Sequence, residues 1–264
     1  MGKLTGLSEA NLAFDLPPGI APRPSRPPPP RRKDQTSDTE PEAGPEGHRK
    51  RLRDKLLRAG PEALADYELL EMLLFLALPR VDTKPLAKRL MARFGSFGRT
   101  VSAPEPELRG VEGAGDAVIA ALRLARATAL KLMAEEVREA PVLNNWERLI
   151  DYLSAALARE SVEQFRILFL DSRNRLLADE AQARGTVNHT PVYPREVVKR
   201  ALELGATALI LVHNHPSGDP TPSRADREMT AEVKAAAATL GIVVHDHLII
   251  GNGRHLSFRR EGLL

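Results

Sequence analysis

The spacing of apolar residues in the first half of the chain is that of amphipathic helices. Three segments show it, at 47–60, 67–78 and 84–95. A glycine or a proline stands where each of them would end, namely Gly60, Pro79 and Gly95. The pattern continues through 108–140 and breaks at Pro141, because the residue before a proline disfavours helix. We therefore predict a small all-α domain at 47–140.

The pattern changes in the second half of the chain. Residues 163–180 alternate, with Phe165, Ile167 and Phe169 on one face and a polar turn at 171–174, which predicts a β-hairpin. The other expected elements are a helix at 146–158 capped by Asn144 or Asn145, a helix at 194–205, a strand at 207–213, a helix from about 223 to 240 and a strand at 242–250. Since the central strands are apolar throughout, we expect an α/β domain at 141–264 whose sheet is covered on both faces.

The first 46 residues have a different composition. They are rich in proline and contain a basic block followed by an acidic block. Such a segment cannot bury enough apolar surface to offset its chain entropy, so 1–46 is predicted to be a disordered tail. A docking site for a partner is the alternative interpretation.

The overall composition excludes several kinds of site. The 264 residues include no cysteine, which rules out disulfides, thiolate zinc ligands, iron–sulfur clusters and a cysteine nucleophile. The 38 basic residues nearly balance the 35 acidic ones, so the net charge of +3 permits nucleic-acid contact without demanding it. No run is long enough to span a bilayer, and the start lacks a secretory signal. We expect a cytoplasmic protein without membrane contact.

Possible metal ligands are dense in residues 211–230. His213 and His215 end a predicted strand, where residues two apart point to the same side. A zinc ion needs at least one more protein ligand, and Asp226 is the candidate. Ser223 and Asp226 also have the spacing of a helix capping box, and Ser223 can serve both as a cap and as support for an oxyanion.

A hydrolytic zinc site also needs a general base. Glu163 opens the first predicted strand of the second domain and is the best placed acidic residue. Glu160, Glu180 and Glu196 remain competitors that spacing does not exclude.

The spacing H-x-H, seven residues, S-x-x-D resembles the signature of the JAMM (JAB/MPN) zinc metallopeptidases. The bacterial RadC family of JAMM-domain proteins is similar in further segments, at 54–74, 171–176, 185–188, 195–202, 213–226 and 246–251. The resemblance implies a cytidine-deaminase-like MPN/JAB fold and a metalloprotease that hydrolyses a peptide or protein substrate. It further implies that His213, His215 and Asp226 hold Zn²⁺, that Glu163 is the acid/base, and that Ser223 supports the transition state.

Two other histidine segments bear on this site. Asp246 and His247 match the DH pair of the RadC family, and we predict that His247 orients a metal ligand from behind. His245 repeats the H-x-H spacing with His247, and a hydrogen-bonded pair in a half-buried strand is an equally good interpretation. His189 lies in a loop that could line the site.

A turn in the helical domain gives a second hypothesis. Gly113 and Gly115 precede an alanine-rich helix, as in helix-hairpin-helix units that bind nucleic-acid phosphates. Asp116 would repel a phosphate, so a turn used only for packing is slightly favoured. The alternative function is a DNA-binding accessory protein in DNA repair, with a structural or inactive metal domain. Nucleobase deamination is excluded, because its sites use cysteine ligands and the chain has none.

Overall fold

The computed structural model describes residues 45–184 and 192–264. The predicted tail at 1–46 lies almost wholly outside the described residues, as does His189. None of the helices in the described ranges is long and apolar enough to cross a membrane.

The helical region forms its own apolar core. Its helices are α1 (Pro45–Ala59), α2 (Asp66–Ala77), α3 (Lys84–Phe94), α4 (Phe97–Val101), α5 (Glu105–Arg109) and α6 (Asp116–Arg138). Leucines from α2, α3, α5 and α6 fill the core, among them the fully buried Leu70, Leu90 and Leu122. Gly95 ends α3 in the left-handed conformation that glycine adopts most readily, as the sequence pattern predicts. The short helices α4 and α5 were not predicted.

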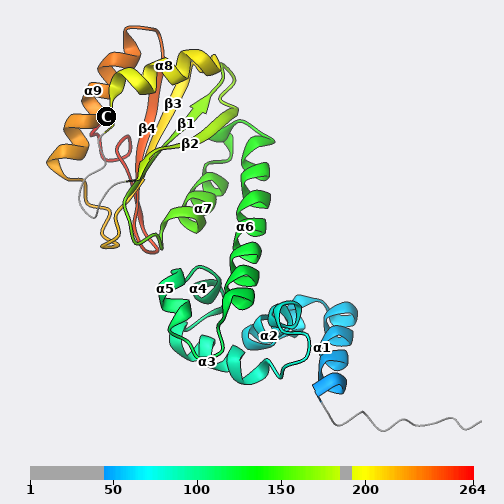
Figure 1. The fold of residues 1–264 in the computed structure, drawn as a ribbon. Coiled ribbons are helices and arrows are strands. Elements are labelled where there is room, and N and C mark those ends of the chain that lie inside the picture. Colours follow the sequence, from blue (N-terminus) through cyan, green and yellow to red (C-terminus); the bar gives the residue numbers. More distant parts are fainter. Residues whose placement is uncertain (1–44, 185–191) are drawn as a thin grey trace, which may run out of the picture. The chain divides into compact units, whose positions relative to one another are not determined.

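The second half of the chain forms a mixed five-stranded sheet (Figure 1). Its strands are β1 (Gln164–Leu170), β2 (Leu176–Arg184), β3 (Ala208–Asn214), β4 (Val243–Ile250) and β5 (His255–Ser257), in the order β2-β1-β3-β4-β5. Among the strands of the described residues, only β3 and β4 pair in parallel, and the other neighbours are antiparallel. The predicted hairpin and the strand–helix–strand unit are confirmed, whereas the three-residue β5 was not predicted.

Helices cover both faces of this sheet, as the apolar central strands predict. The helix α7 (Trp146–Leu157) and the last turns of α6 pack on one face, where Leu168, Ile210 and Val212 are buried. The helices α8 (Pro194–Leu204) and α9 (Arg224–Ala238) pack on the other, over Phe165, Ile167 and their neighbours (Figure 1). Asn145 is the N-cap residue of α7, as predicted, although its side chain makes no capping hydrogen bond.

The strand register determines which side chains meet at the end of β3. Phe165 of β1 lies opposite His213, and His247 of β4 lies beside Leu211. A shift of one residue in either pairing would turn every side chain of that strand to the opposite face. The two apolar faces therefore specify the register, and the register in turn places the polar residues at the strand end.

We predict that Leu168→Ala lowers the free energy of unfolding by about 2–5 kcal/mol, because it leaves a cavity in the centre of the sheet. Leu168 is fully buried, whereas Leu177 on the neighbouring strand is 41% exposed. Leu177→Ala is the matched control and should cost about 0.5 kcal/mol. Urea denaturation followed by circular dichroism measures both, and equal losses in the two variants would contradict the described packing.

Candidate metal centre

Two imidazoles reach one point because they stand two residues apart at the end of a buried strand. Every residue of β3 is buried, and His213 is the sixth of its seven residues. His215 follows directly after the strand end. The two Nε2 atoms lie 2.9 Å apart. His213 is only 1% exposed at its side chain, whereas His215 is 17% exposed.

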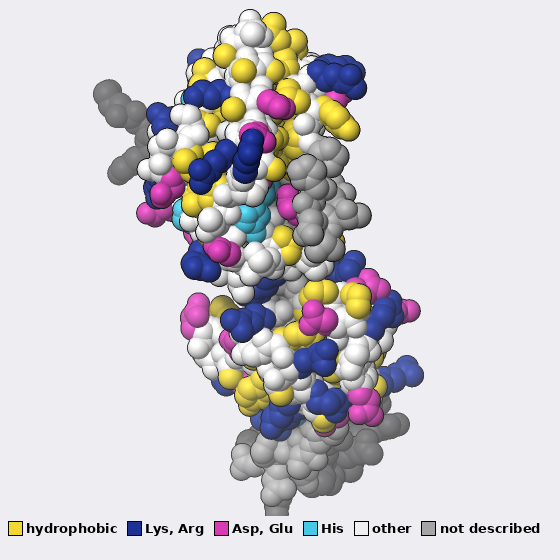
Figure 2. Space-filling model, turned by 90° about the vertical axis from the view of Figure 1, so that its left-hand side faces the viewer, with side chains coloured by type: hydrophobic (Ala, Val, Ile, Leu, Met, Phe, Trp, Pro, Cys, Tyr) yellow, Lys and Arg dark blue, Asp and Glu magenta, His cyan; other side chains and the backbone are white. Residues whose placement is uncertain are grey.

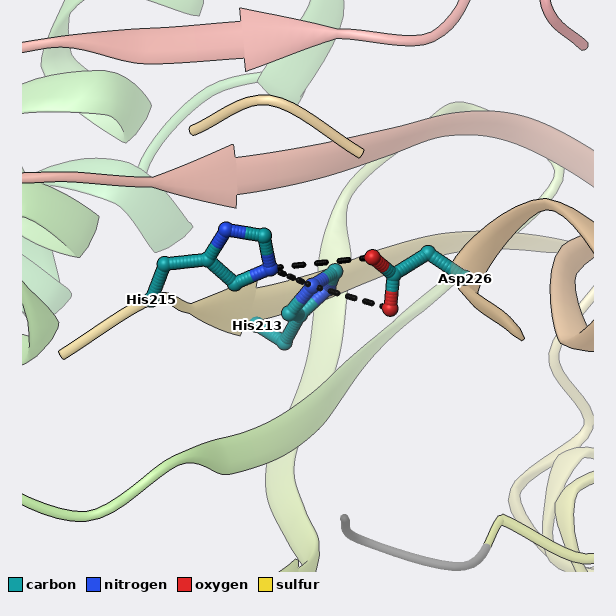
Figure 3. Close-up of side chains that lie close together, drawn as sticks. All are labelled: His213, His215 and Asp226. Carbon is teal, nitrogen blue, oxygen red and sulfur yellow. Dashed lines mark hydrogen bonds and ion pairs between the residues drawn. The ribbon is translucent and has the colours of Figure 1, made fainter. Parts of the chain in front are cut away.

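A carboxylate approaches the same point from the first turn of α9. The Oδ1 atom of Asp226 lies 3.4 Å from Nε2 of His213, and its Oδ2 atom lies 3.6 Å from Nε2 of His215 (Figure 3). The ligand atoms of the three residues all lie within 4.8 Å of one another, and among the described residues they form the one such group of three or more.

The spacing of these atoms fits a tetrahedral metal ion. Zinc bonds of 2.0–2.1 Å at tetrahedral angles place neighbouring ligand atoms about 3.3 Å apart. The two nitrogen–oxygen distances of 3.4 and 3.6 Å are close to that value, and the nitrogen–nitrogen distance of 2.9 Å is shorter. Two histidines and one carboxylate are a donor set that zinc accepts while leaving a position for water or substrate.

The hydrogen bonds behind the imidazoles fix their tautomers. The Nδ1 atom of His215 lies 2.7 Å from the carbonyl oxygen of Asp219, which only accepts, so Nδ1 carries the proton. Its Nε2 lone pair is therefore free to bind a metal.

A longer chain of hydrogen bonds determines which ring nitrogen of His213 carries the proton. The hydroxyl of Thr230 donates to the carbonyl oxygen of Asp226, so its oxygen accepts from Nδ1 of His247 at 2.6 Å. Nε2 of His247 then accepts from Nδ1 of His213 at 2.7 Å. His213 is thus left with an unprotonated Nε2 facing Asp226. His247 is fully buried and contacts His213 from the side opposite Asp226, and its role in orienting a metal ligand stays a prediction.

The charges of these groups are complementary. Burial opposes ionisation of Asp226, but His213 and His215 outweigh it when their imidazoles are protonated, and they hold the pKa of this carboxyl well below its ordinary value. The tautomers described above are those of the neutral rings, in which Nε2 carries the lone pair. The Asp226 carboxylate, which accepts a hydrogen bond from the protonated ring, is also the main cause that raises the pKa of His215. Burial lowers the pKa of His247 well below its ordinary value, which keeps this imidazole neutral, as its accepting Nε2 requires.

Glu163 stands immediately before β1, close to His215. The antiparallel register sets Phe165 opposite His213, and continuing it by two residues sets Glu163 opposite His215. The charge of Glu163 contributes, after the Asp226 hydrogen bond, to the raised pKa of His215. The carboxylate thus acts on the His215 imidazole through space.

Asn214, the residue between the two histidines, holds the backbone on both sides of Glu163. Its Oδ1 accepts from the amide of Gln164 at 2.9 Å. Its Nδ2 donates to the carbonyl oxygens of Val162 at 3.2 Å and of Glu160 at 3.4 Å. Because Asn214 is only 1% exposed, these bonds are shielded from water. Its role was not predicted, because spacing alone does not show which backbone groups a side chain will meet.

Ser223 forms the capping box that its spacing predicts. Its Oγ accepts from the amide of Asp226 at 3.1 Å and donates to Oδ2 of Asp226 at 2.7 Å. The Ser223 amide donates to the same Oδ2. The hydroxyl proton of Ser223 is therefore already committed to Asp226.

The other candidate bases make ion pairs away from this point. Glu160 pairs with Arg126, Glu180 pairs with Arg200, and Glu196 pairs with Arg195. The side chain of Arg195 is highly exposed, so the pair with Glu196 lies at the surface.

His245 does not join the site either. The pairing of β3 with β4 is irregular between Leu209 and Ile210, whose partners are Val244 and Asp246. This irregularity skips His245, and its Nε2 instead pairs with Oδ1 of Asn174 at 2.7 Å.

The glycine turn of the helical region is built into its core. Gly113 has a φ of +88°, and Ala114 between the two glycines is buried with the helical core. Gly115 is the N-cap of α6, and Asp116 forms an ion pair with Arg109 at 2.7 Å. These contacts explain a packing role, while phosphate binding by Gly113 and Gly115 stays a prediction.

Solvent reaches the histidine side of the molecule. Figure 2 shows histidine atoms at the surface among acidic and basic side chains. The partial exposure of His215 and Asp226, at 17% and 14% of their side chains, agrees with that view. Solvent therefore reaches the point on which His215 and Asp226 converge.

Comparison with known proteins connects the chain to one family. Residues 143–263 match the family model described as the RadC-like JAB domain. A UPF0758 protein of Rhodobacter capsulatus is 60% identical over 213 residues, which cover 81% of this chain and 100% of that protein. A UPF0758 protein of Ruegeria pomeroyi is 54% identical over 217 residues, which cover 82% of this chain and 97% of that protein.

We predict that Thr230→Val weakens zinc binding by about 10- to 100-fold, because it removes the oxygen that fixes the tautomers of His247 and His213. Competition with a chromophoric chelator measures the affinity. Thr239→Val is the matched control, since Thr239 also donates to a carbonyl of its own helix but at the exposed far end. An affinity within about twofold of the wild type for Thr230→Val would contradict the tautomer argument.

Proposed function

The chain belongs to the RadC family of JAB-domain proteins, and on that premise we propose that it is a zinc-dependent hydrolase of the JAMM type. Its substrate in this proposal is an amide bond, either a peptide bond or an isopeptide bond, in a peptide or protein. One observation carries the proposal: two histidine nitrogens and a carboxylate converge on one solvent-accessible point, with a second carboxylate across the strand pair.

His213, His215 and Asp226 would hold the metal through Nε2, Nε2 and a carboxylate oxygen. A bound Zn²⁺ supplies Lewis-acid activation of water and of the scissile carbonyl group. The protein contributes fixed ligands, because Asp219 and His247 hold the two rings from behind. Fixed ligands avoid the cost of reorganising the site during each reaction.

Glu163 is the proposed acid/base. As an ionised carboxylate it accepts the proton of the attacking water and then gives it to the nitrogen of the leaving amine. Asn214 keeps this carboxylate in place by binding the backbone at Val162 and Gln164, on either side of it. Positioning of this kind matters because proton transfer requires hydrogen-bond distance to the reacting atoms.

Ser223 is proposed to act mainly through Asp226. Its hydroxyl proton and its amide both bind Oδ2 of Asp226, which leaves Oδ1 free of these two bonds. Donation to an oxyanion by the same hydroxyl would require the bond to Asp226 to be exchanged. Ser223 can therefore support the transition state only if its hydroxyl leaves the capping hydrogen bond to Asp226.

We predict that Glu163→Gln lowers kcat by at least about 100-fold while zinc affinity stays within about twofold, because only the proton acceptor is lost. Profiling on a library of peptides and isopeptides with zinc-loaded protein measures the rates, and chelator competition measures the affinity. Glu180→Gln, on the neighbouring strand and paired with Arg200, is the control and should keep the wild-type rate. Equal cleavage by the wild type and Glu163→Gln would remove the catalytic proposal.

We also predict that Asp226→Ala abolishes stoichiometric zinc binding, since two imidazoles alone do not form a closed or catalytic zinc site. Metal analysis of the purified protein, with circular dichroism as the folding check, measures this. Glu228→Ala on the same helix serves as the control, because Glu228 is more than half exposed and pairs only with Arg224 among the described residues. Full zinc content in Asp226→Ala would show that the ligand assignment is wrong.

A further inference from the structure

A concave site lies away from the candidate metal ligands. Its volume is about 700 Å³, and it is lined by the α4–α5 segment, by one side of α6 and by the turn that follows α7. Its charged lining residues are Arg109, Arg123, Arg126, Arg159, Glu105 and Glu160. None of His213, His215 and Asp226 lines it.

The carboxylates in this cavity do not balance its arginines. Glu105 is shared, with Oε1 at 2.7 Å from Arg109 and Oε2 at 3.1 Å from Arg123. Glu160 pairs with Arg126 at 3.0 Å and also accepts from Gln164. Arg109 also pairs with Asp116, which lies outside the lining. Four lining arginines therefore face two lining carboxylates and Asp116, and both lining carboxylates already have two partners.

Of the four arginines that line the cavity, Arg159 has the fewest hydrogen-bond and ion-pair partners among the described residues. Within the described ranges it forms no ion pair with a carboxylate, and its guanidinium lies near Gly98 at the start of α4. Burial, followed by the charges of Arg99 and Arg126, lowers the pKa of Arg159. The surroundings of Arg159 are thus positively charged, and an anion there would relieve the repulsion.

Arg126 also has an unused donor. Its Nη2 donates to the carbonyl oxygen of Ala156 and to Glu160, both at 3.0 Å. Its Nε is buried and has no hydrogen-bond partner among the described residues. A buried donor without a partner is costly, so a ligand or an ordered water is expected beside it.

We propose that this cavity binds a phosphate group through Arg159, Arg123 and Arg126. Guanidinium groups bind phosphate oxygens in pairs, and arginines from different elements surround a tetrahedral anion better than they surround a planar carboxylate. The volume exceeds that of a single phosphate and lies in the range of sites for small organic ligands. The phosphate is accordingly either part of a small molecule or part of a nucleic-acid backbone.

This site does not depend on the proposed hydrolase activity. It is built from other residues, and phosphate binding needs neither zinc nor Glu163. The two sites share only the segment after α7, where the carboxylate of Glu160 faces the cavity and its carbonyl oxygen accepts from Asn214. Binding can therefore be measured on protein without added metal.

The test uses three probes at low ionic strength, where charge interactions are screened least. Isothermal titration calorimetry is carried out with inorganic phosphate and with adenosine monophosphate. Fluorescence anisotropy is carried out with a labelled DNA duplex. Each probe is measured on the full chain and on Arg159→Gln, Arg123→Gln and the control Arg195→Gln.

Arg195 is 83% exposed at its side chain and does not line the cavity, so the control removes the same charge elsewhere.

We expect Arg159→Gln and Arg123→Gln to weaken binding by at least about tenfold, while Arg195→Gln changes it by less than about twofold. Loss with phosphate or the nucleotide identifies a small-molecule site, and loss with the duplex alone identifies a backbone phosphate. Thermal unfolding confirms that the variants are folded. Absence of binding to all three probes, or equal effects of Arg159→Gln and Arg195→Gln, would overturn the proposal.

Discussion

The candidate metal centre depends on the buried hydrogen bond between His213 and His247. This bond joins two neighbouring parallel strands and determines which nitrogen of His213 carries the proton. His247 is held in turn by Thr230 of α9, whose hydroxyl binds the backbone of Asp226. One continuous set of hydrogen bonds therefore positions a ligand on a strand and a ligand on a helix. Since this set is buried, loss of any member leaves a polar group without a partner in a medium of low dielectric constant.

The local parts of the site could be predicted from the sequence. The spacing of His213 and His215 follows from the period of a strand, and the spacing of Ser223 and Asp226 follows from a helix start. The hairpin and the covered sheet follow from alternation and from apolar strands. Each of these inferences depends on residues that are near one another in the chain.

The remaining parts depend on contacts between distant segments. Asn214 meets the backbone around Glu163 only because β1 and β3 pair in one register. Thr230 reaches His247 only because α9 packs on the sheet beside β4. The repeated H-x-H of His245 and His247 suggested a pair, but an irregularity in β4 separates them. Short elements such as α4, α5 and β5 escaped prediction because few residues carry their pattern.

The order of the elements along the chain also has a consequence for biosynthesis. The predicted acid/base precedes β1, the candidate ligands lie at the end of β3, directly after it and in the first turn of α9, and the histidine that contacts His213 lies in β4. Parallel pairing of β3 with β4 requires the whole of α9 to be in place between them. A nascent chain on the ribosome therefore carries His213, His215 and Asp226 for some time before His247 has been synthesised. At the proposed zinc site, tight metal capture would then begin only when β4 has emerged and paired, so zinc uptake there would report the completion of this domain.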